Sequence, residues 1–252
     1  MIEVKKVSKF FGNKQVLFDI DTCFQPGKVN LIIGRSGSGK TVLMKCLVGL
    51  YTPDEGQILY QGRDFHHLQG KEQRQLRAEM GMVFQGAALF DSMTIEENVM
   101  FPLDMFTSLS DSEKLDRVNF CLNRVDLANV NALYPAELSG GMKKRAAIAR
   151  AIACNPQYLF CDEPNSGLDP KTSLVIDNLI YDITRELGIT TVVNTHDLNS
   201  VITIGDTISF VYEGHLEWRG DKDSVLVSDN PKLNDFIYAQ PLTQKIRKTQ
   251  TK

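Results

Sequence analysis

The pattern of apolar and polar residues along the chain predicts a mixed α/β fold. Alternation over residues 3–7 and 16–24, followed by a turn at Pro26-Gly27, predicts antiparallel strands at the N-terminus. Short, largely apolar runs are typical of strands buried on both faces of a parallel sheet, and they occur at residues 29–33, 81–84 and 158–161. Residues 190–195, rich in threonine and valine, predict another buried strand. Hairpins are also expected at residues 57–62 and 207–218.

The segment between residues 86 and 157 shows helical periodicity and no strand pattern. Thr94 and Ser110 each precede acidic residues in the manner of helix N-caps, and alanine and isoleucine at helical spacing predict a helix over residues 143–153.

We therefore expect a single domain over residues 1–252. Its α/β core, residues 1–86 and 158–240, would include the N-terminal β subdomain and carry an inserted helical subdomain at residues 87–157. Residues 241–252 contain four basic and no acidic side chains. They are expected to form a basic, solvated tail.

A glycine-rich loop connects the apolar run at residues 29–33 to the helix expected at residues 42–48. Its sequence is Gly34-Arg35-Ser36-Gly37-Ser38-Gly39-Lys40-Thr41. The spacing Gly-x4-Gly-Lys-Thr is typical of a phosphate-binding loop, because glycine lets successive N–H groups converge on an anion and the helix N-terminus adds positive charge. Lys40 would reach the β- and γ-phosphates, and Thr41 would offer its hydroxyl to Mg²⁺. A Gly/Ser-rich connection without a ligand is the alternative, but the flanking strand and helix favour a nucleoside triphosphate site.

Two carboxylates, Asp162 and Glu163, follow the apolar run at residues 158–161. Asp162 can hold Mg²⁺ directly or through water, and Glu163 can orient and deprotonate a water. Such a pair is also a common strand cap, but beside a phosphate loop it predicts a catalytic centre. Gln85 and His196 follow strands at the same rim, where ligands bind in open α/β sheets. Alone, that glutamine is a weak signal and a single histidine is more often structural.

Three further features each allow two interpretations. Ser139-Gly140-Gly141 at the start of a helix is either a second anion site or an ordinary serine N-cap. Phe10 and Phe11 either divide between core and surface, or one of them stacks on an adenine ring. An apolar cluster forms either internal packing, the simpler interpretation, or a docking groove; its members are Leu89, Phe90, Met93, Val99, Phe101 and Pro102.

Composition narrows the class of protein. A hydrophobic content of 42% and a charged content of 23% are ordinary for a globular chain, and a net charge of -3 disfavours nucleic acid as the main partner. No apolar stretch approaches the roughly 20 residues that cross a bilayer, and the N-terminus has no signal-peptide pattern. Membrane association would therefore come through a partner. Five cysteines without Cys-x2-Cys spacing disfavour a metal site and indicate a reducing, cytoplasmic compartment.

Together these residues resemble the ATP-binding subunits of ABC transporters over residues 1 to about 225. The matching motifs occur in the family's order: Walker A at Gly34 to Thr41, the Q-loop at Gln85, the signature at residues 138–142, Walker B at residues 158–163, the D-loop at residues 166–169 and the H-loop at His196. Phe11 falls where the family stacks an aromatic ring on adenine. The resemblance implies a P-loop NTPase (RecA-like) α/β core with an N-terminal antiparallel β subdomain and an inserted α-helical subdomain.

The resemblance also implies roles for these residues. In the family, a Walker A loop of one chain and a signature loop of another enclose each ATP, so a homodimer would place Lys40 opposite Ser139, Gly140 and Gly141 of the second copy. Glu163 would be the general base, and His196 would contact the γ-phosphate. Asp169 would bridge the subunits, and Gln85 would report the nucleotide state. The Mg²⁺ ligands would be Thr41, Gln85 and Asp162.

Two residues depart from the usual family pattern. Val42 stands where many members carry threonine, which removes a hydroxyl near the α-phosphate but keeps the backbone N–H at this nucleotide-binding position. Met142 replaces the more usual glutamine. With residues 84–94, Met142 is similar to the ATPases of MCE-type, Mla-like systems that move phospholipid across the bacterial envelope. That likeness implies a polytopic permease, a periplasmic MCE lipid-binding protein, and a peripheral location at the cytoplasmic face of the inner membrane, with the apolar cluster receiving the permease's coupling helix.

Three functions are compared on these grounds. The first is the ATPase of an MCE-linked phospholipid transporter, favoured by Met142 and residues 84–94. The second is the ATPase of a polar-solute importer, for example of an amino acid, which would share the fold and chemistry. The third is an ABC ATPase that acts on nucleic acid or ribosomes without a permease; a single nucleotide-binding unit, no long coiled-coil insertion and no basic surface run disfavour it.

Overall fold

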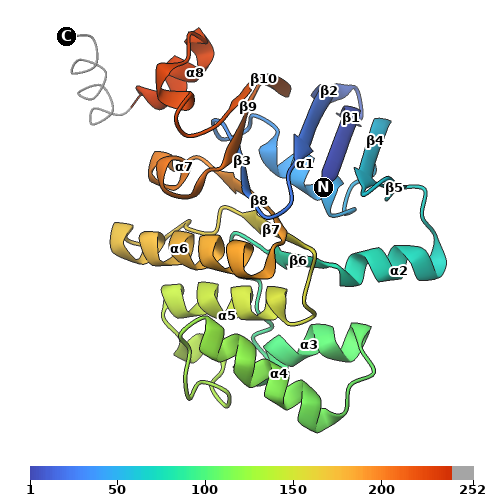
Figure 1. Cartoon of the computed structure of the whole chain (residues 1–252), viewed down its shortest axis with the longest axis vertical. Helices are drawn as coiled ribbons and strands as arrows, with labels where there is room; N and C mark the ends of the chain where they lie inside the picture. The colour runs from blue at the N-terminus through green and yellow to red at the C-terminus, as the bar shows by residue number, and fades with distance from the viewer. Residues whose placement is uncertain (240–252) are drawn as a thin grey trace.

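The computed structural model describes residues 1–239 and contains two β-sheets of different type (Figure 1). The smaller sheet is antiparallel, with strand order β2-β1-β4-β5. Its strands are β1 (Ile2–Phe11), β2 (Lys14–Phe24), β4 (Glu55–Tyr60) and β5 (Arg63–Asp64). The predicted N-terminal strands and the hairpin at residues 57–62 are confirmed. The tail predicted at residues 241–252 lies outside the described residues.

The larger sheet has the strand order β10-β9-β3-β8-β7-β6. Its strands are β3 (Val29–Ile33), β6 (Met80–Val83), β7 (Tyr158–Asp162), β8 (Thr190–Thr195), β9 (Thr207–Tyr212) and β10 (His215–Gly220). All neighbouring pairs are parallel except β9 and β10, which form the predicted second hairpin. Because parallel strands end at one edge of a sheet, the residues that follow β3, β6, β7 and β8 share that edge.

Side chains of the central strands alternate between two apolar cores. Leu31 of β3 belongs to one core and the adjacent Ile32 to the other; Leu159 and Phe160 of β7 divide in the same way. One core also contains helix α1 (Lys40–Leu47) and the smaller sheet, so α1 lies between the two sheets. The other contains helices α5 (Gly140–Ile152) and α6 (Pro170–Leu187). The sheet is thus covered on both faces, which explains why β3, β7 and β8 are buried throughout.

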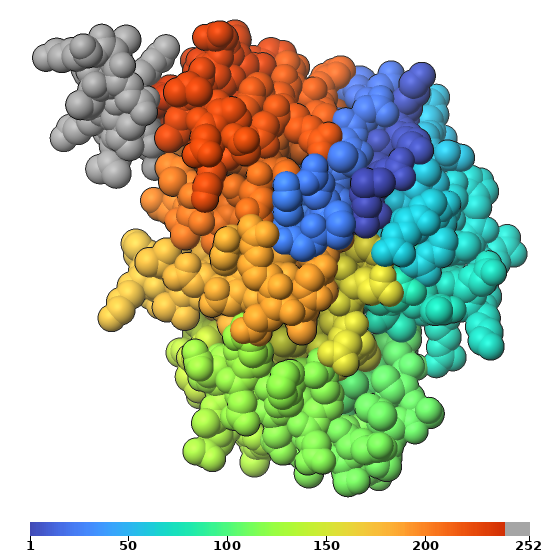
Figure 2. Space-filling view, viewed as in Figure 1, coloured from blue at the N-terminus to red at the C-terminus, as the bar shows by residue number. Residues whose placement is uncertain are grey.

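Helices α3 (Ile95–Phe106) and α4 (Asp111–Arg124) pack with α5 into a lobe at one end of the molecule (Figures 1 and 2). Both begin at the predicted N-caps: Thr94 with Glu97, and Ser110 with Glu113, form reciprocal capping boxes. No strand occurs between residues 87 and 157 of the described chain. The subdomain boundaries themselves stay a prediction.

Helix α2 (Gly70–Ala78) precedes β6, and two further helices were not expected from the sequence. These are α7 (Leu198–Ile204) and α8 (Pro231–Ile237), each of seven residues and therefore too short to show a clear helical period. Single turns of 3-10 helix lie at Pro135–Glu137 and Val225–Val227. Helices α1 and α5 begin at Lys40 and Gly140, two or three residues earlier than the sequence indicated, because their glycine-containing first turns hide the helical pattern.

Candidate active site

The predicted phosphate loop connects the end of β3 to the start of α1, at the C-terminal edge of the larger sheet. Gly34 has a φ of 151°, and a Cβ at this position would lie 2.2 Å from the carbonyl oxygen of Val211, so only glycine fits. Gly39 precedes the helix in a left-handed conformation with a φ of 105°. The first turn of α1 therefore opens toward the loop, as anion binding by helix N–H groups requires.

Lys40 folds back over this loop. Its Nζ donates to the carbonyl oxygens of Gly34 at 2.9 Å and Arg35 at 3.1 Å, and the residue is only 5% exposed. Burial lowers the pKa of the Lys40 ammonium, whereas the nearby charges of Glu163 and Asp162 act in the opposite direction. The backbone thus holds the cation inside the loop, where an incoming phosphate can replace the carbonyl contacts.

Ser38 supplies an unsatisfied group in the same loop. Its Oγ is buried and has no hydrogen-bond partner among the described residues. A buried hydroxyl without a partner is costly, so such a group points to a polar ligand. Together with the converging loop, this orphan hydroxyl fits a bound polyphosphate.

Oxygen ligands suited to a divalent cation meet beside the loop. The Thr41 hydroxyl donates to Oδ1 of Asp162 at 3.4 Å, and Nδ2 of Asn194 donates to the same oxygen at 2.9 Å. Hydroxyl and carboxylate oxygens are the ligands that Mg²⁺ prefers. Asn194 was not predicted as a site residue, because it is one of several buried polar residues in strand β8, whose other polar members are threonines. Its Oδ1 also lacks a partner in the described chain.

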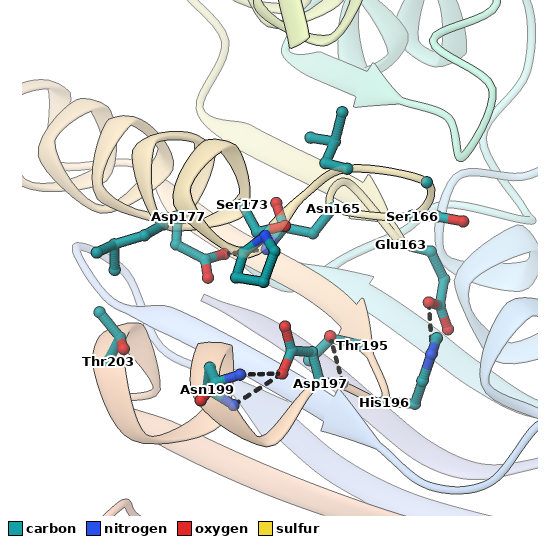
Figure 3. Close-up of a pocket in the computed structure, with 14 residues that line it drawn as sticks. Glu163, Asn165, Ser166, Ser173, Asp177, Thr195, His196, Asp197, Asn199 and Thr203 are labelled. Atoms are coloured by element: carbon teal, nitrogen blue, oxygen red, sulfur yellow. Dashed lines mark hydrogen bonds and ion pairs between the residues drawn. The ribbon is translucent and has the colours of Figure 1, made fainter. Parts of the chain in front are cut away.

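Glu163 and His196 come together from the ends of β7 and β8, as Figure 3 shows. Nδ1 of His196 lies 2.6 Å from Oε2 of Glu163. Glu163 has a φ of 51°, which is uncommon for a non-glycine residue and frequent at functional sites. Both residues line a cavity of about 540 Å³ next to the loop that follows β7. This pair offers a carboxylate base and an imidazole in one place.

Gln85 extends from the end of β6 toward the same region. Its Nε2 donates to Oγ of Ser166 at 3.2 Å. The structure adds a contact that the sequence did not suggest: Nζ of the buried Lys144 on α5 donates to the Gln85 carbonyl oxygen. Arg150, also on α5, donates to the carbonyl oxygens of Ala88 at 2.8 Å and Ala87 at 3.0 Å. Two cations of one helix therefore hold the segment that carries Gln85.

The predicted signature residues do not line the cavity that contains Glu163 and His196. Ser139 is the N-cap of α5 and accepts a hydrogen bond from Met142 N at 3.3 Å, so the ordinary-cap interpretation describes this chain by itself. Among described residues no hydrogen bond joins Ser139 to the phosphate loop. It lines a second cavity, of about 660 Å³, with Gly140, Gly141 and Asp169. A Cβ on Gly141 would lie 2.7 Å from Cγ2 of Thr172, which explains glycine at this close approach.

Asp169 and Phe11 have local contacts that neither confirm nor contradict the roles implied for them. Asp169 is the N-cap of α6 and accepts from Lys171 N and Thr172 N, each at 3.0 Å. Hydrogen bonds, the largest from the Thr172 side chain, lower the pKa of the Asp169 carboxyl. Phe11 is 43% exposed, and its ring packs against that of Tyr51 in a T-shaped arrangement with 5.3 Å between the ring centroids. Phe11 is thus an exposed aromatic ring of the kind that can stack on a base.

The predicted apolar cluster divides between packing and a groove. Val99 is fully buried in the core. Phe90, Phe101 and Pro102 instead line an open apolar hollow of about 480 Å³ with Phe84 and Phe106, next to Arg150. The Phe90 and Phe101 rings lie 4.9 Å apart. Internal packing therefore describes Val99, and docking at the hollow stays a prediction.

Comparison with known proteins adds independent findings. The family model "ABC transporter" matches residues 17–166. The chain is 38% identical over 236 residues to the probable ribonucleotide transport ATP-binding protein mkl of Mycobacterium leprae, an alignment that covers 94% of this chain and 68% of the relative. It is also 38% identical over 237 residues to the methionine import ATP-binding protein MetN of Clostridium acetobutylicum, covering 94% of this chain and 74% of that protein.

The fold has a close match among solved structures. The dimeric ATP-binding cassette MJ0796, in a post-hydrolysis state bound to ADP and Pi, superimposes with a TM-score of 0.80 at 32% sequence identity. The match covers 88% of this chain and 99% of that chain. The α/β architecture predicted from the sequence is confirmed.

Proposed function

The chain belongs to the ABC transporter family as an ATP-binding and ATP-hydrolysing subunit, and we propose that two copies of it enclose two ATP molecules and drive a membrane permease. The observation that carries the proposal is the separation of two anion-binding features within one chain. Lys40, Asp162 and Glu163 gather at one edge of the sheet, whereas Ser139 lines another cavity. A second copy would bring its signature residues to the first copy's phosphate loop and complete the site.

In this proposal the side chains divide the work of hydrolysis. The loop from Gly34 to Thr41, with Val42 N at its end, holds the phosphates, and Lys40 neutralises their charge. Glu163 takes the proton from the attacking water. His196, held by Glu163 at 2.6 Å, orients that carboxylate and contacts the γ-phosphate. Gln85 senses the occupied site, and Asp169 contacts the second copy. The residues that would hold Mg²⁺ are Thr41, Asp162 and Gln85, and the ion would offset phosphate charge.

The apolar hollow is proposed as the seat of a permease helix. It is lined by aromatic side chains, among them Phe84, Phe90 and Phe101, which suit the apolar face of an amphipathic helix. Phe84 directly precedes Gln85, so a helix seated there would act on the segment that carries Gln85. No helix of the described residues is long and apolar enough to cross a membrane. In this proposal the chain lies at the cytoplasmic face of the cell membrane and is bound there through the permease.

We propose phospholipid of the bacterial envelope as the substrate, within an MCE-type system that includes a periplasmic lipid-binding protein. Support comes from Met142 and from residues 84–94, whose likeness to that branch is described above. A polar-solute importer is the second candidate. It is favoured by the 38% identity to a protein named for methionine import. The two candidates share every residue of the catalytic site and differ in the permease.

A trapping experiment tests both the proposed permease partner and the proposed phospholipid substrate. Tagged Glu163→Gln chain would be expressed in its host and purified with MgATP in mild detergent, and co-purifying proteins and lipids would be identified by mass spectrometry. Tagged Lys40→Ala chain serves as the matched control, because it should not form the ATP-closed dimer. A polytopic permease with an MCE protein and bound phospholipid supports the lipid system. An amino-acid-type permease supports the second candidate, and ribosomes or nucleic acid without a membrane protein would contradict the permease proposal.

A further inference from the structure

A buried carboxylate outside the phosphate site links two segments of the chain. Asp177 lies on α6 and is 2% exposed. Its Oδ1 accepts a hydrogen bond from Nδ2 of Asn165 at 2.8 Å, and its Oδ2 accepts one from Oγ of Ser200 at 2.8 Å. Nδ2 of Asn165 also donates to Oγ of Ser200 at 3.2 Å. The three side chains therefore form a closed hydrogen-bonded triangle.

Each hydrogen bond of Asp177 leads toward one member of the pair Glu163 and His196. The bond to Asn165 and the bond to Ser200 are called the two arms of the triangle. Asn165 lies two residues after Glu163, in the loop between β7 and α6. Ser200 lies four residues after His196, in α7, whose N-cap is Asp197. All of these except Ser200 line the cavity of about 540 Å³ drawn in Figure 3, with Asp177 on one side and the Glu163–His196 contact on the other. The carboxylate thus fixes the loop after Glu163 relative to the helix after His196.

The electrostatics of Asp177 suggest a positional rather than a stabilising role. Among the described residues lining the cavity, none is lysine or arginine; the titratable groups facing it are Asp197 of α7, Glu163 and His196. Burial raises the pKa of the Asp177 carboxyl to about 6, the hydrogen bonds from Ser200 and Asn165 oppose this shift, and the charge of Asp197 adds to it. An ionised buried carboxylate without a cation costs stability, but it provides two fixed acceptors.

We propose that Asp177 is a positioning residue for ATP hydrolysis. Through Asn165 and Ser200, its ionised carboxylate fixes the position of Glu163 relative to His196. The proposal rests on the roles proposed above for Glu163 and His196. Asp177 itself contacts neither nucleotide nor attacking water. When Asp177 is protonated, one of its oxygens becomes a donor. In the observed orientation Asn165 presents its Nδ2 donor to this carboxyl, so the side chain of Asn165 or that of Ser200 must rearrange.

Steady-state ATPase kinetics of the full-length chain with MgATP test the proposal. The variant is Asp177→Asn, and the matched control is Asp182→Asn, an exposed acid on the same helix. We expect Asp177→Asn to lower kcat about tenfold and to change KM less than twofold, because misplaced catalytic groups affect the chemical step and leave the phosphate loop intact. The control should behave as the wild type. An Asp177→Asn variant with wild-type kcat, or with a changed KM alone, would overturn the proposal.

The pH profile separates positioning from a loss of folded protein. Wild-type kcat should fall as the pH drops through about 6, and this component should be missing from the Asp177→Asn profile. An identical acid limb in the two proteins would show that the limb does not come from Asp177, which contradicts the proposal.

Ser200→Ala keeps the test decisive if Asp177→Asn does not fold. It removes only the arm to α7 and should lower kcat about threefold without changing KM. In the Asp177→Asn background it should have less than about a twofold further effect, because the arm is already broken. Wild-type kcat in Ser200→Ala, or fully multiplicative effects in the double variant, would refute the positioning role.

Turnover of Glu163→Gln distinguishes this inference from the proposed function. If Glu163→Gln is inactive and Asp177→Asn has wild-type kcat, the role of Asp177 fails and the role of Glu163 stands. If Glu163→Gln retains wild-type turnover, the proposed base is wrong, and the claim that Asp177 positions a general base fails with it.

Discussion

Nδ1 of His196 lies 2.6 Å from Oε2 of Glu163, although the two residues are 33 positions apart and follow different strands. A neutral histidine that donates from Nδ1 carries its lone pair on Nε2, so this contact selects the tautomer of the ring. It also restrains a glutamate whose backbone φ of 51° is already unusual. The contact therefore orients the two groups proposed to handle the water and the γ-phosphate.

Glu163→Gln should bind ATP but lose turnover. Glutamine keeps the size and one acceptor of glutamate but cannot take a proton, and loss of a general base typically costs about 10² to 10⁴ in rate. We expect ATP-dependent dimers to accumulate, which size-exclusion chromatography with light scattering would detect. Wild-type turnover in this variant would remove Glu163 from the role of base.

Lys40→Ala should weaken ATP binding itself. The substitution removes the ammonium that the loop carbonyls hold at 2.9 Å and 3.1 Å, and a hydrogen bond to a charged group is worth about 1.5–3 kcal/mol, or roughly 10-fold to 100-fold in affinity. Calorimetric titration with ATP would measure the change. Lys28→Ala is the control, because Lys28 directly precedes β3 at its opposite end. Unchanged affinity in Lys40→Ala would count against the assigned phosphate loop.

Ser139→Arg should block hydrolysis but not nucleotide binding by the isolated chain. Within the described residues, Ser139 makes no hydrogen bond with the phosphate loop of its own chain, so the bulky cation would act only where two copies meet. We expect a turnover loss of at least about tenfold with ATP affinity within about twofold. Ser139→Ala, which removes only the helix cap, separates loss of the cap from the steric effect. Lost binding by the monomeric variant would contradict assembly across a dimer.

The free energy of unfolding should change with pH through Asp177. The native pKa of about 6 exceeds the ordinary 3.8, so the native state holds this proton more tightly, and the group's contribution to stability falls as pH rises from about 4 to about 6. Asp177→Asn lacks this titration. Between about pH 4.5 and about pH 7, the stability of the variant relative to wild type should rise by about 2 kcal/mol. Urea unfolding at the two pH values measures it; a constant difference would show that Asp177 has an ordinary pKa.

Arg150→Lys should loosen the segment that follows Gln85. Ala87 and Ala88 have φ values of 64° and 51°, an unfavourable conformation for alanine, and Arg150 holds both carbonyl oxygens with its two terminal nitrogens. Lysine cannot reproduce this fork, so we expect a loss of about 1–3 kcal/mol in unfolding free energy. Hydrogen exchange should also accelerate at residues 85–90. Arg77→Lys on the exposed face of α2 is the control. Unchanged exchange would mean that the segment holds its conformation without Arg150.

The sequence alone determined most of the architecture. Buried strands such as β3 and β7 appear as largely apolar runs because both of their faces are covered. The starts of α3 and α4 can be predicted from their capping residues, which lie within four positions of the first helical residue. The phosphate loop can also be identified from the sequence, since its chemistry requires glycine, lysine and threonine at fixed spacing within a few residues of one another. In each case the determinants lie close together in the sequence.

Tertiary structure alone decided the contacts between distant residues. Asp177 has nothing in its local sequence to distinguish it from the exposed Asp182; only packing of α6 against α7 buries it and joins Asn165 to Ser200. Asn194 meets Asp162, and Lys144 meets Gln85, for the same reason. Periodicity tells which face of an element is buried but not which side chain lies opposite, because that depends on the order and register of strands that are far apart in the sequence.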